Sequence, residues 1–181
     1  MILFVTILIG DYMEKSKVIV VADAGPIIHL DELDCLEILA DFETVFIPET
    51  VWNEVIKHRP SALPCNKVNF VCQSKISLSA QVTALTPLYT LHKGEQDALH
   101  LCMEFERSLL LTDDTAARLA AKNIGVSAHG TLGLLVRAIR QKSLTKTDVL
   151  ALLRSIPAKT TLHIRASLLT EVINDVDRQA K

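Results

Sequence analysis

The stretch Lys17-Val-Ile-Val-Val-Ala-Asp-Ala-Gly-Pro-Ile-Ile-His-Leu30 decides the fold. Its apolar residues from Val18 to Ala22 run into a single carboxylate, Asp23, and the Gly25-Pro26 pair then breaks the strand. A short β-branched run between such breakers is typical of a strand that is buried on both faces. Because ligands of open α/β sheets bind beyond the carboxyl ends of the strands, Asp23 is predicted to lie where a functional site would form.

Further strand and helix patterns alternate along the rest of the chain. Thr50 is predicted to cap the helix that begins at Val51, and Pro87 is predicted to end the helix that begins near Ser77. Strands alternating with helices favour an α/β fold, a three-layer α/β/α sandwich with a mostly parallel central sheet. The other predicted strands are 44–48, 68–72, 109–112 and 126–128, and the other predicted helices are 95–107, 115–123, 130–140, 146–155 and 165–176.

Composition narrows the class of protein. The 181 residues are 49% hydrophobic, which is enough for one sizeable core. With a formal net charge of −2 the chain has no bulk positive field, so contact with nucleic acid would need a local basic patch or a metal ion. The four cysteines, Cys35, Cys65, Cys72 and Cys102, lack zinc-site spacing, and scattered thiols indicate a reducing, cytoplasmic location.

Acidic residues recur at the positions where a metal site would form. Asp23 and the pair Asp113-Asp114 each follow an apolar strand, and Glu54 and Asp97 flank apolar helix faces. Carboxylates that converge repel one another unless a cation lies between them, and Mg²⁺ and Mn²⁺ prefer oxygen ligands. Such a site can activate water for attack on a phosphodiester.

These segments together resemble the PIN domains, including the VapC-type toxin ribonucleases. The similarity covers roughly residues 17–140. The resemblance implies a PIN-like fold and a metal-dependent endoribonuclease whose substrate is RNA. It further implies that the protein is the toxin of a toxin–antitoxin pair, with a small antitoxin protein as its partner. A homodimer and no association with a membrane are expected. The implied catalytic and metal-binding residues for Mg²⁺ or Mn²⁺ are Asp23, Glu54, Asp97, Asp113 and Asp114. The matching segments are Val-Ala-Asp23-Ala-Gly-Pro-Ile-Ile, Val-Trp-Asn-Glu54-Val, Gly-Glu-Gln-Asp97-Ala-Leu, Leu-Leu-Thr112-Asp-Asp-Thr-Ala-Ala-Arg118 and Gly130-Thr-Leu-Gly133.

Two departures from the family pattern leave alternatives open. Many VapC relatives carry Ser or Thr two residues after the first acid, where this chain has Gly25. The fourth acid is either Asp113 or Asp114. A catalytically silent PIN module that binds RNA or a protein partner is therefore the competing function. Phosphatases of the haloacid-dehalogenase type and response-regulator receivers are disfavoured because the second acid that each requires near Asp23 is absent.

Several of these acids also have an ordinary structural interpretation, and for Glu54 alone a solvated helix face is preferred. Asp23 is placed to cap the turn into the next helix, and Asp113 and Asp114 are placed as first-turn acids favoured by the helix dipole. Asp114 is also spaced to pair with Arg118. For Glu95 the first-turn role is preferred over a ligand role.

Candidate contacts to substrate phosphates follow the last acids. They are Thr112, Arg118, Lys122 and Arg137, although exposed basic residues are more often simply solvated. The chain is divided into an N-terminal extension at 1–16 that is suited to an added strand, a PIN-like core at 17–141, and C-terminal helices at 142–181 packed on the same domain.

Overall fold

The computed structural model describes residues 18–178. At its centre lies a parallel sheet of five strands in the order β3-β2-β1-β4-β5, so β1 and β4 are neighbours in the middle. Val20 pairs in register with Val45 on one side and with Leu109 on the other. The strands are β1 (Ile19–Ala22), β2 (Val45–Pro48), β3 (Phe70–Gln73), β4 (Ser108–Leu111) and β5 (Ser127–His129).

The central strands are buried on both faces, as the apolar runs predict. Val20 and Ala22 pack into one hydrophobic cluster, whereas Val21 between them packs into another on the opposite face. Leu109 and Leu111 join the first cluster and Leu110 the second. This alternation follows from the two-residue period of a strand, and it divides the core into two layers.

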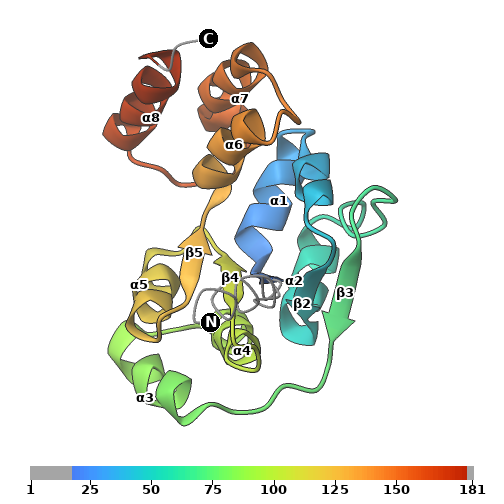
Figure 1. Ribbon diagram of the computed structural model, residues 1–181, viewed down its shortest axis with the longest axis vertical. Coiled ribbons are helices and arrows are strands. Elements are labelled where there is room, and N and C mark those ends of the chain that lie inside the picture. Colours follow the sequence, from blue (N-terminus) through green and yellow to red (C-terminus); the bar gives the residue numbers. More distant parts are fainter. Residues whose placement is uncertain (1–17, 179–181) are drawn as a thin grey trace, which may run out of the picture.

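Helices cover both faces of the sheet (Figure 1). The larger cluster is completed by α1 (Ala24–Glu32), the 3₁₀ helix η1 (Leu36–Asp41), α2 (Glu49–His58), α6 (Thr131–Arg140) and α7 (Lys146–Lys159). The smaller cluster is completed by α3 (Ala80–Tyr89), α4 (Lys93–Cys102) and α5 (Thr115–Asn123). The predicted three-layer α/β/α sandwich with a parallel sheet is therefore confirmed.

The last helix, α8 (Ala166–Arg178), lies beside α7 at one end of the molecule (Figure 1). It buries Leu169 and Val176 in the larger cluster. The segment that leads to it is fastened to α1, because the Thr161 amide donates a 2.8 Å hydrogen bond to the carboxylate of Glu32.

Three local predictions about helices were wrong. The helix predicted for 95–107 ends at Cys102, because the chain must turn there to enter β4. Pro87 lies inside the last turn of α3, which continues to Tyr89. Thr50 does not cap α2, whose N-cap residue is Pro48, and its hydroxyl instead donates to Asp97 at 2.9 Å.

The predicted extension at 1–16 lies outside the described residues, and the division of the chain into 17–141 and 142–181 stays a prediction. Within residues 18–178, none of the helices combines the length and the apolar character needed to cross a membrane.

Candidate metal centre

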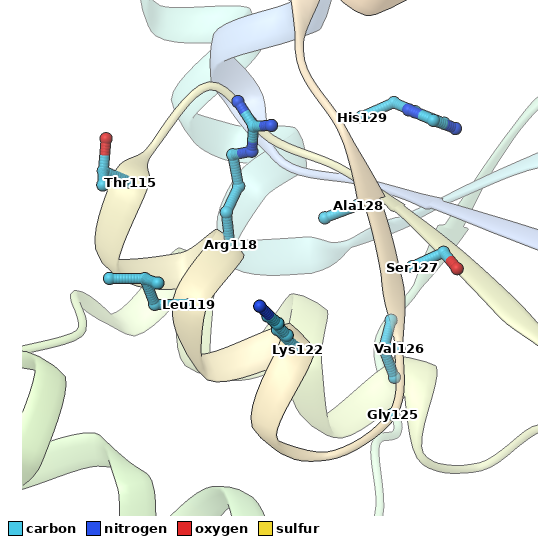
Figure 2. A pocket seen from close by; sticks show the side chains of 9 residues that line it. All are labelled: Thr115, Arg118, Leu119, Lys122, Gly125, Val126, Ser127, Ala128 and His129. Atoms are coloured by element: carbon cyan, nitrogen blue, oxygen red, sulfur yellow. The ribbon is translucent and has the colours of Figure 1, made fainter.

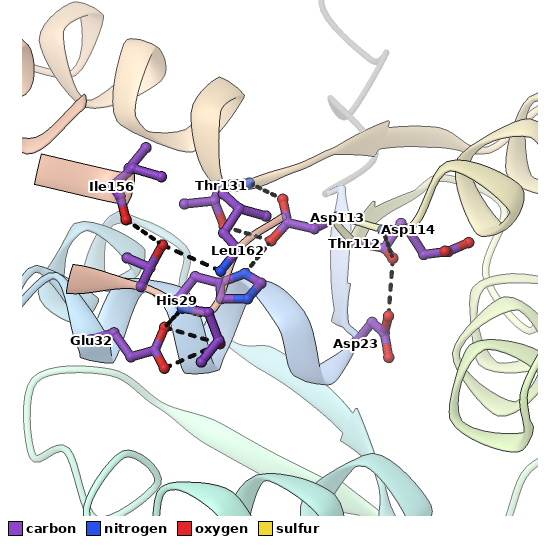
Figure 3. A network of polar contacts seen from close by, with 11 residues as sticks. Asp23, His29, Glu32, Thr112, Asp113, Asp114, Thr131, Ile156 and Leu162 are labelled. Carbon is purple, nitrogen blue, oxygen red and sulfur yellow. Dashed lines mark hydrogen bonds and ion pairs between the residues drawn. The ribbon is translucent and has the colours of Figure 1, made fainter. Parts of the chain in front are cut away.

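Asp23 joins the carboxyl ends of the two central strands. Its backbone amide donates to the Leu111 carbonyl at 2.9 Å, and its Oδ2 accepts a 3.0 Å hydrogen bond from the Thr112 hydroxyl (Figure 3). Asp23 is the N-cap residue of α1, yet its side chain makes no capping hydrogen bond. The capping interpretation therefore does not account for this carboxylate.

The Asp23 carboxylate is held where ionisation is costly. Burial raises its pKa to about 6, and the negative charges of Glu95 and Glu54 add to this increase. Hydrogen bonds from the Ala24 amide and the Thr112 hydroxyl act in the opposite direction. A carboxylate whose pKa is raised in this way at the end of a central strand is a candidate functional group.

Glu54 and Asp23 both lie beside Gly94, together with a methyl group of Val51. A Cβ atom placed on Gly94 would lie 3.6 Å from Oε2 of Glu54 and 3.8 Å from Oδ1 of Asp23. The missing side chain at Gly94 therefore leaves a small cradle between two carboxylates, one following β1 and one on α2.

Glu95 belongs to the same group of acids. Burial raises its pKa, and the charges of Asp114 and Glu54 raise it further. Its Oε2 also accepts a 2.8 Å hydrogen bond from the His92 amide, which closes a capping box at the start of α4. Glu95 thus has the first-turn role that the sequence favours. Its negative charge also lies beside Asp23, and this second role was not predicted from the sequence. The sequence feature that could have indicated this role is Gly94, the residue before Glu95. A glycine in the first turn of a helix indicates that another group approaches the backbone closely there.

Asp97 has other partners. It is 7% exposed, its Oδ2 accepts from the Thr50 hydroxyl at 2.9 Å, and its Oδ1 accepts from the Lys93 ammonium at 2.6 Å. Both oxygens are thus engaged, one by Thr50 of α2 and the other by Lys93 one turn earlier on α4 itself. The structure gives Asp97 a structural tie, while Glu95 supplies the acid of α4 whose charge raises the pKa of Asp23.

The adjacent acids Asp113 and Asp114 point in different directions (Figure 3). Asp114 caps α5 by accepting from the Ala117 amide at 2.7 Å, and its charge raises the pKa of Glu95. Its own amide donates to the Thr112 hydroxyl at 3.2 Å, the same hydroxyl that contacts Asp23. Asp114 is accordingly the member of the pair that lies with the other acids.

Asp113 instead fastens α1 and α6 to the end of β4. Its Oδ2 lies 2.8 Å from Nδ1 of His29 and 2.6 Å from the Thr131 hydroxyl, and its Oδ1 accepts from the Thr131 amide at 2.7 Å. A Cβ on Gly130 would lie 2.6 Å from Oδ1 of Asp113, so this glycine is required for the contact. The Gly-Thr pair at the start of α6 is therefore explained by its fit around Asp113.

Gly25 also borders Asp113. A Cβ at position 25 would meet Asp113 Oδ2 at 3.5 Å and His29 Cε1 at 3.6 Å. The side chain of a serine or threonine at this position would therefore contact the His29–Asp113 pair.

The predicted phosphate contacts fall into three environments. Thr112 is buried and donates to Asp23. Arg137 is paired with Asp41 and lies over the Phe42 ring at 4.2 Å from its centroid, so it is already engaged. Arg118 and Lys122 are exposed on α5.

The residues present fit a divalent cation that keeps much of its water shell. In the described part of the chain, no group of three or more Asp, Glu, His and Cys side chains is arranged closely enough to form a complete ligand set. Mg²⁺ commonly binds through one or two carboxylates plus waters, so a complete protein cage is not required. The oxygen-only donors, the missing side chain at Gly94 and the mutual repulsion of Asp23, Glu54 and Glu95 suit a cation held in this way.

The chain thus combines an α/β/α sandwich with acidic side chains gathered at the carboxyl edge of its parallel sheet. A family model described as a PIN domain matches residues 19–178, and the chain belongs to this family. The match extends through α8 and so includes the C-terminal helices. A comparison with curated proteins found no match. PIN domains are generally nucleases, and PIN-domain nucleases generally use divalent metal ions.

Proposed function

We propose that this protein is a Mg²⁺- or Mn²⁺-dependent endoribonuclease. The observation that carries the proposal is the gathering of Asp23, Glu54, Glu95 and Asp114 at one edge of a PIN-domain sheet. Asp23 and Glu54 flank the cradle at Gly94 and would hold the cation, with Glu95 and Asp114 completing the negative field around it. The bound cation would supply charge neutralisation at the scissile phosphate and a water of lowered pKa.

The other residues of the site act by positioning. The Thr112 hydroxyl donates to Asp23 and accepts from the Asp114 amide, so it fixes the relative positions of the acids that follow β1 and β4. The Thr50 hydroxyl donates to Asp97 and thereby joins α2, which carries Glu54, to α4, which carries Glu95. The site thus depends on four separate elements that meet at the sheet edge.

The first test is cleavage of a mixed-sequence RNA by the purified protein with Mg²⁺ or Mn²⁺. We expect cleavage to require the metal, to stop with EDTA and to fall at least about 100-fold in Asp23→Asn, because this change removes a ligand charge while keeping side-chain shape. Wild-type protein that binds RNA but cleaves none, across many RNAs and both metals, would support the catalytically silent PIN module instead.

We further propose a toxin role, with a small antitoxin protein as partner, a homodimeric state and a cytoplasmic location. The support is the similarity of the acidic segments to those of VapC-type toxins. Induced expression in a bacterial host is expected to arrest growth, and Asp23→Asn expressed at the same level is expected not to do so. Equal growth of both strains would argue against the toxin role while leaving the nuclease proposal standing.

A further inference from the structure

A groove runs along the edge of the sheet between α5 and β5. Its volume is about 670 Å³, and β5 is the outermost strand on this side of the sheet. Gly125 and Ala128 form part of its floor, and Thr115 stands at the end nearest the start of α5 (Figure 2). Leu119 and Val126 also line the groove, which is open to solvent and not enclosed.

The groove is basic although the whole chain carries a net charge of −2. Arg118 and Lys122 are exposed and spaced four residues apart, so both lie on the side of α5 that faces the groove. His129 on β5 also borders it, but Figure 2 shows its ring pointing away from α5, so the positive charge of the groove comes from Arg118 and Lys122. Among the described residues, no acidic side chain lines this groove, and neither Arg118 nor Lys122 forms an ion pair.

The groove begins at Thr115, the residue that follows Asp114. Asp114 caps α5, and with a rise of 1.5 Å per residue Arg118 and Lys122 lie about 6 Å and about 12 Å further along the helix. Figure 2 shows the Arg118 guanidinium extending toward the N-terminal end of α5. The two cations therefore mark a line that leads away from the acids.

A second hollow continues the basic surface in the other direction. It measures about 400 Å³, shares Thr115, Arg118 and His129 with the groove, and adds Arg165 from the segment before α8. Asp113 also borders it, but the oxygens of Asp113 are taken up by His29 and Thr131. Arg118 thus stands at the junction of two hollows.

We propose that the α5–β5 groove holds the part of a single-stranded RNA that flanks the cleaved bond, with successive phosphates on Arg118 and Lys122. The proposal rests on the ribonuclease function proposed above. An open channel that leads away from the acids, and whose two cations have no ion-pair partner within residues 18–178, suits a flexible polyanion that is cut at one end of the channel. The small floor residues leave room for the sugar and base of such a strand.

The test measures RNA binding separately from cleavage. A fluorescently labelled, mixed-sequence single-stranded RNA is titrated with Asp23→Asn protein in EDTA, and binding is followed by anisotropy. We expect the added double change Arg118→Gln/Lys122→Gln to weaken binding at least about tenfold at low salt. It should also reduce the slope of log affinity against log salt by about 1.4, as expected for two lost phosphate contacts.

The matched control removes the same charges elsewhere. Arg154 on α7 and Lys75 after β3 are exposed and lie outside the groove, so Arg154→Gln/Lys75→Gln is expected to change RNA affinity less than about twofold. Equal weakening in both double variants, or in neither, would overturn the groove proposal. Loss specific to Arg118→Gln/Lys122→Gln would support it even if the wild-type protein proved unable to cleave RNA.

A second readout uses the active enzyme without the Asp23 change. The groove variant is expected to raise KM for RNA cleavage at least about tenfold while kcat stays within about threefold of wild type, because the reacting atoms are untouched. A cleaving enzyme whose KM is unaffected by the groove variant would leave the ribonuclease function intact and contradict the groove proposal.

Discussion

Changing Glu95 to glutamine is expected to slow metal-dependent RNA cleavage by about 100-fold or more, whereas changing Asp97 to asparagine is expected to slow it less than about tenfold. Glu95 contributes charge beside Asp23 and Glu54, while both oxygens of Asp97 are engaged by Thr50 and Lys93. The measurement is the initial cleavage rate of one RNA at saturating Mn²⁺.

The two substitutions are matched in chemistry, since each turns a carboxylate into an amide. Glutamine at position 95 still accepts from the His92 amide, so the capping box and the fold should persist. Unfolding curves of both variants check this point. If Asp97→Asn were folded and inactive while Glu95→Gln kept wild-type activity, Asp97 would be the acid of α4 that serves the metal, and our assignment would be wrong.

Changing Asp113 to alanine is expected to lower the free energy of unfolding by about 3 kcal/mol. Its carboxylate accepts hydrogen bonds from His29, the Thr131 amide and the Thr131 hydroxyl. A hydrogen bond to a charged group contributes about 1.5 to 3 kcal/mol to stability. Water that enters the space left by the carboxylate would recover part of the lost hydrogen bonding. Thr131 is buried, so its amide and its hydroxyl would each lose a hydrogen-bond acceptor. Urea unfolding followed by circular dichroism measures the change.

The neighbouring residue provides the control. Asp114→Ala removes only the cap of α5, which costs about 1 kcal/mol, but it also removes a charge from the metal site. We therefore expect Asp114→Ala to be the more stable and the less active of the two variants. A strongly destabilised Asp114→Ala beside an unaffected Asp113→Ala would reverse the roles that the structure gives them.

The sequence was sufficient to predict the centre of the fold. The apolar runs before Asp23 and before Asp113 are strands β1 and β4, and α5 has the predicted bounds. These elements are specified by local pattern, because both faces of a central strand must be apolar. The end of α4 at Cys102 was not predictable in this way, because no breaker follows it and tertiary packing sets where the chain turns.

The candidate site was predictable only in part. Because β1 and β4 are adjacent parallel strands, the acids that follow them lie at the same edge of the sheet, however the helices pack. Glu95 and Asp97, however, differ by two positions, about 200° around a helix, so the packing of α4 decides which of them faces Asp23. The choice between Asp113 and Asp114 likewise depends on His29 and Thr131, which are remote in sequence.

The measurement that tests the metal site most directly is the unfolding free energy of wild type and Asp23→Asn, with EDTA and with Mn²⁺. Because the folded pKa of Asp23 is raised from 3.8 to about 6, its carboxylate costs stability as the pH rises between these values. At pH 7 in EDTA we expect Asp23→Asn to be more stable than wild type by about 2 kcal/mol, somewhat less than the full shift because the side chain is partly exposed. The difference should vanish below about pH 4.

Mn²⁺ is expected to reverse this order. At an ion concentration about 100 times the dissociation constant, wild type should gain about 2.7 kcal/mol and Asp23→Asn much less, since a ligand stabilises only the folded form that binds it. A crossover of the two stabilities on adding Mn²⁺ is the result we predict. Equal responses of the two proteins to Mn²⁺, or none in wild type, would contradict the assignment of a divalent cation to these carboxylates.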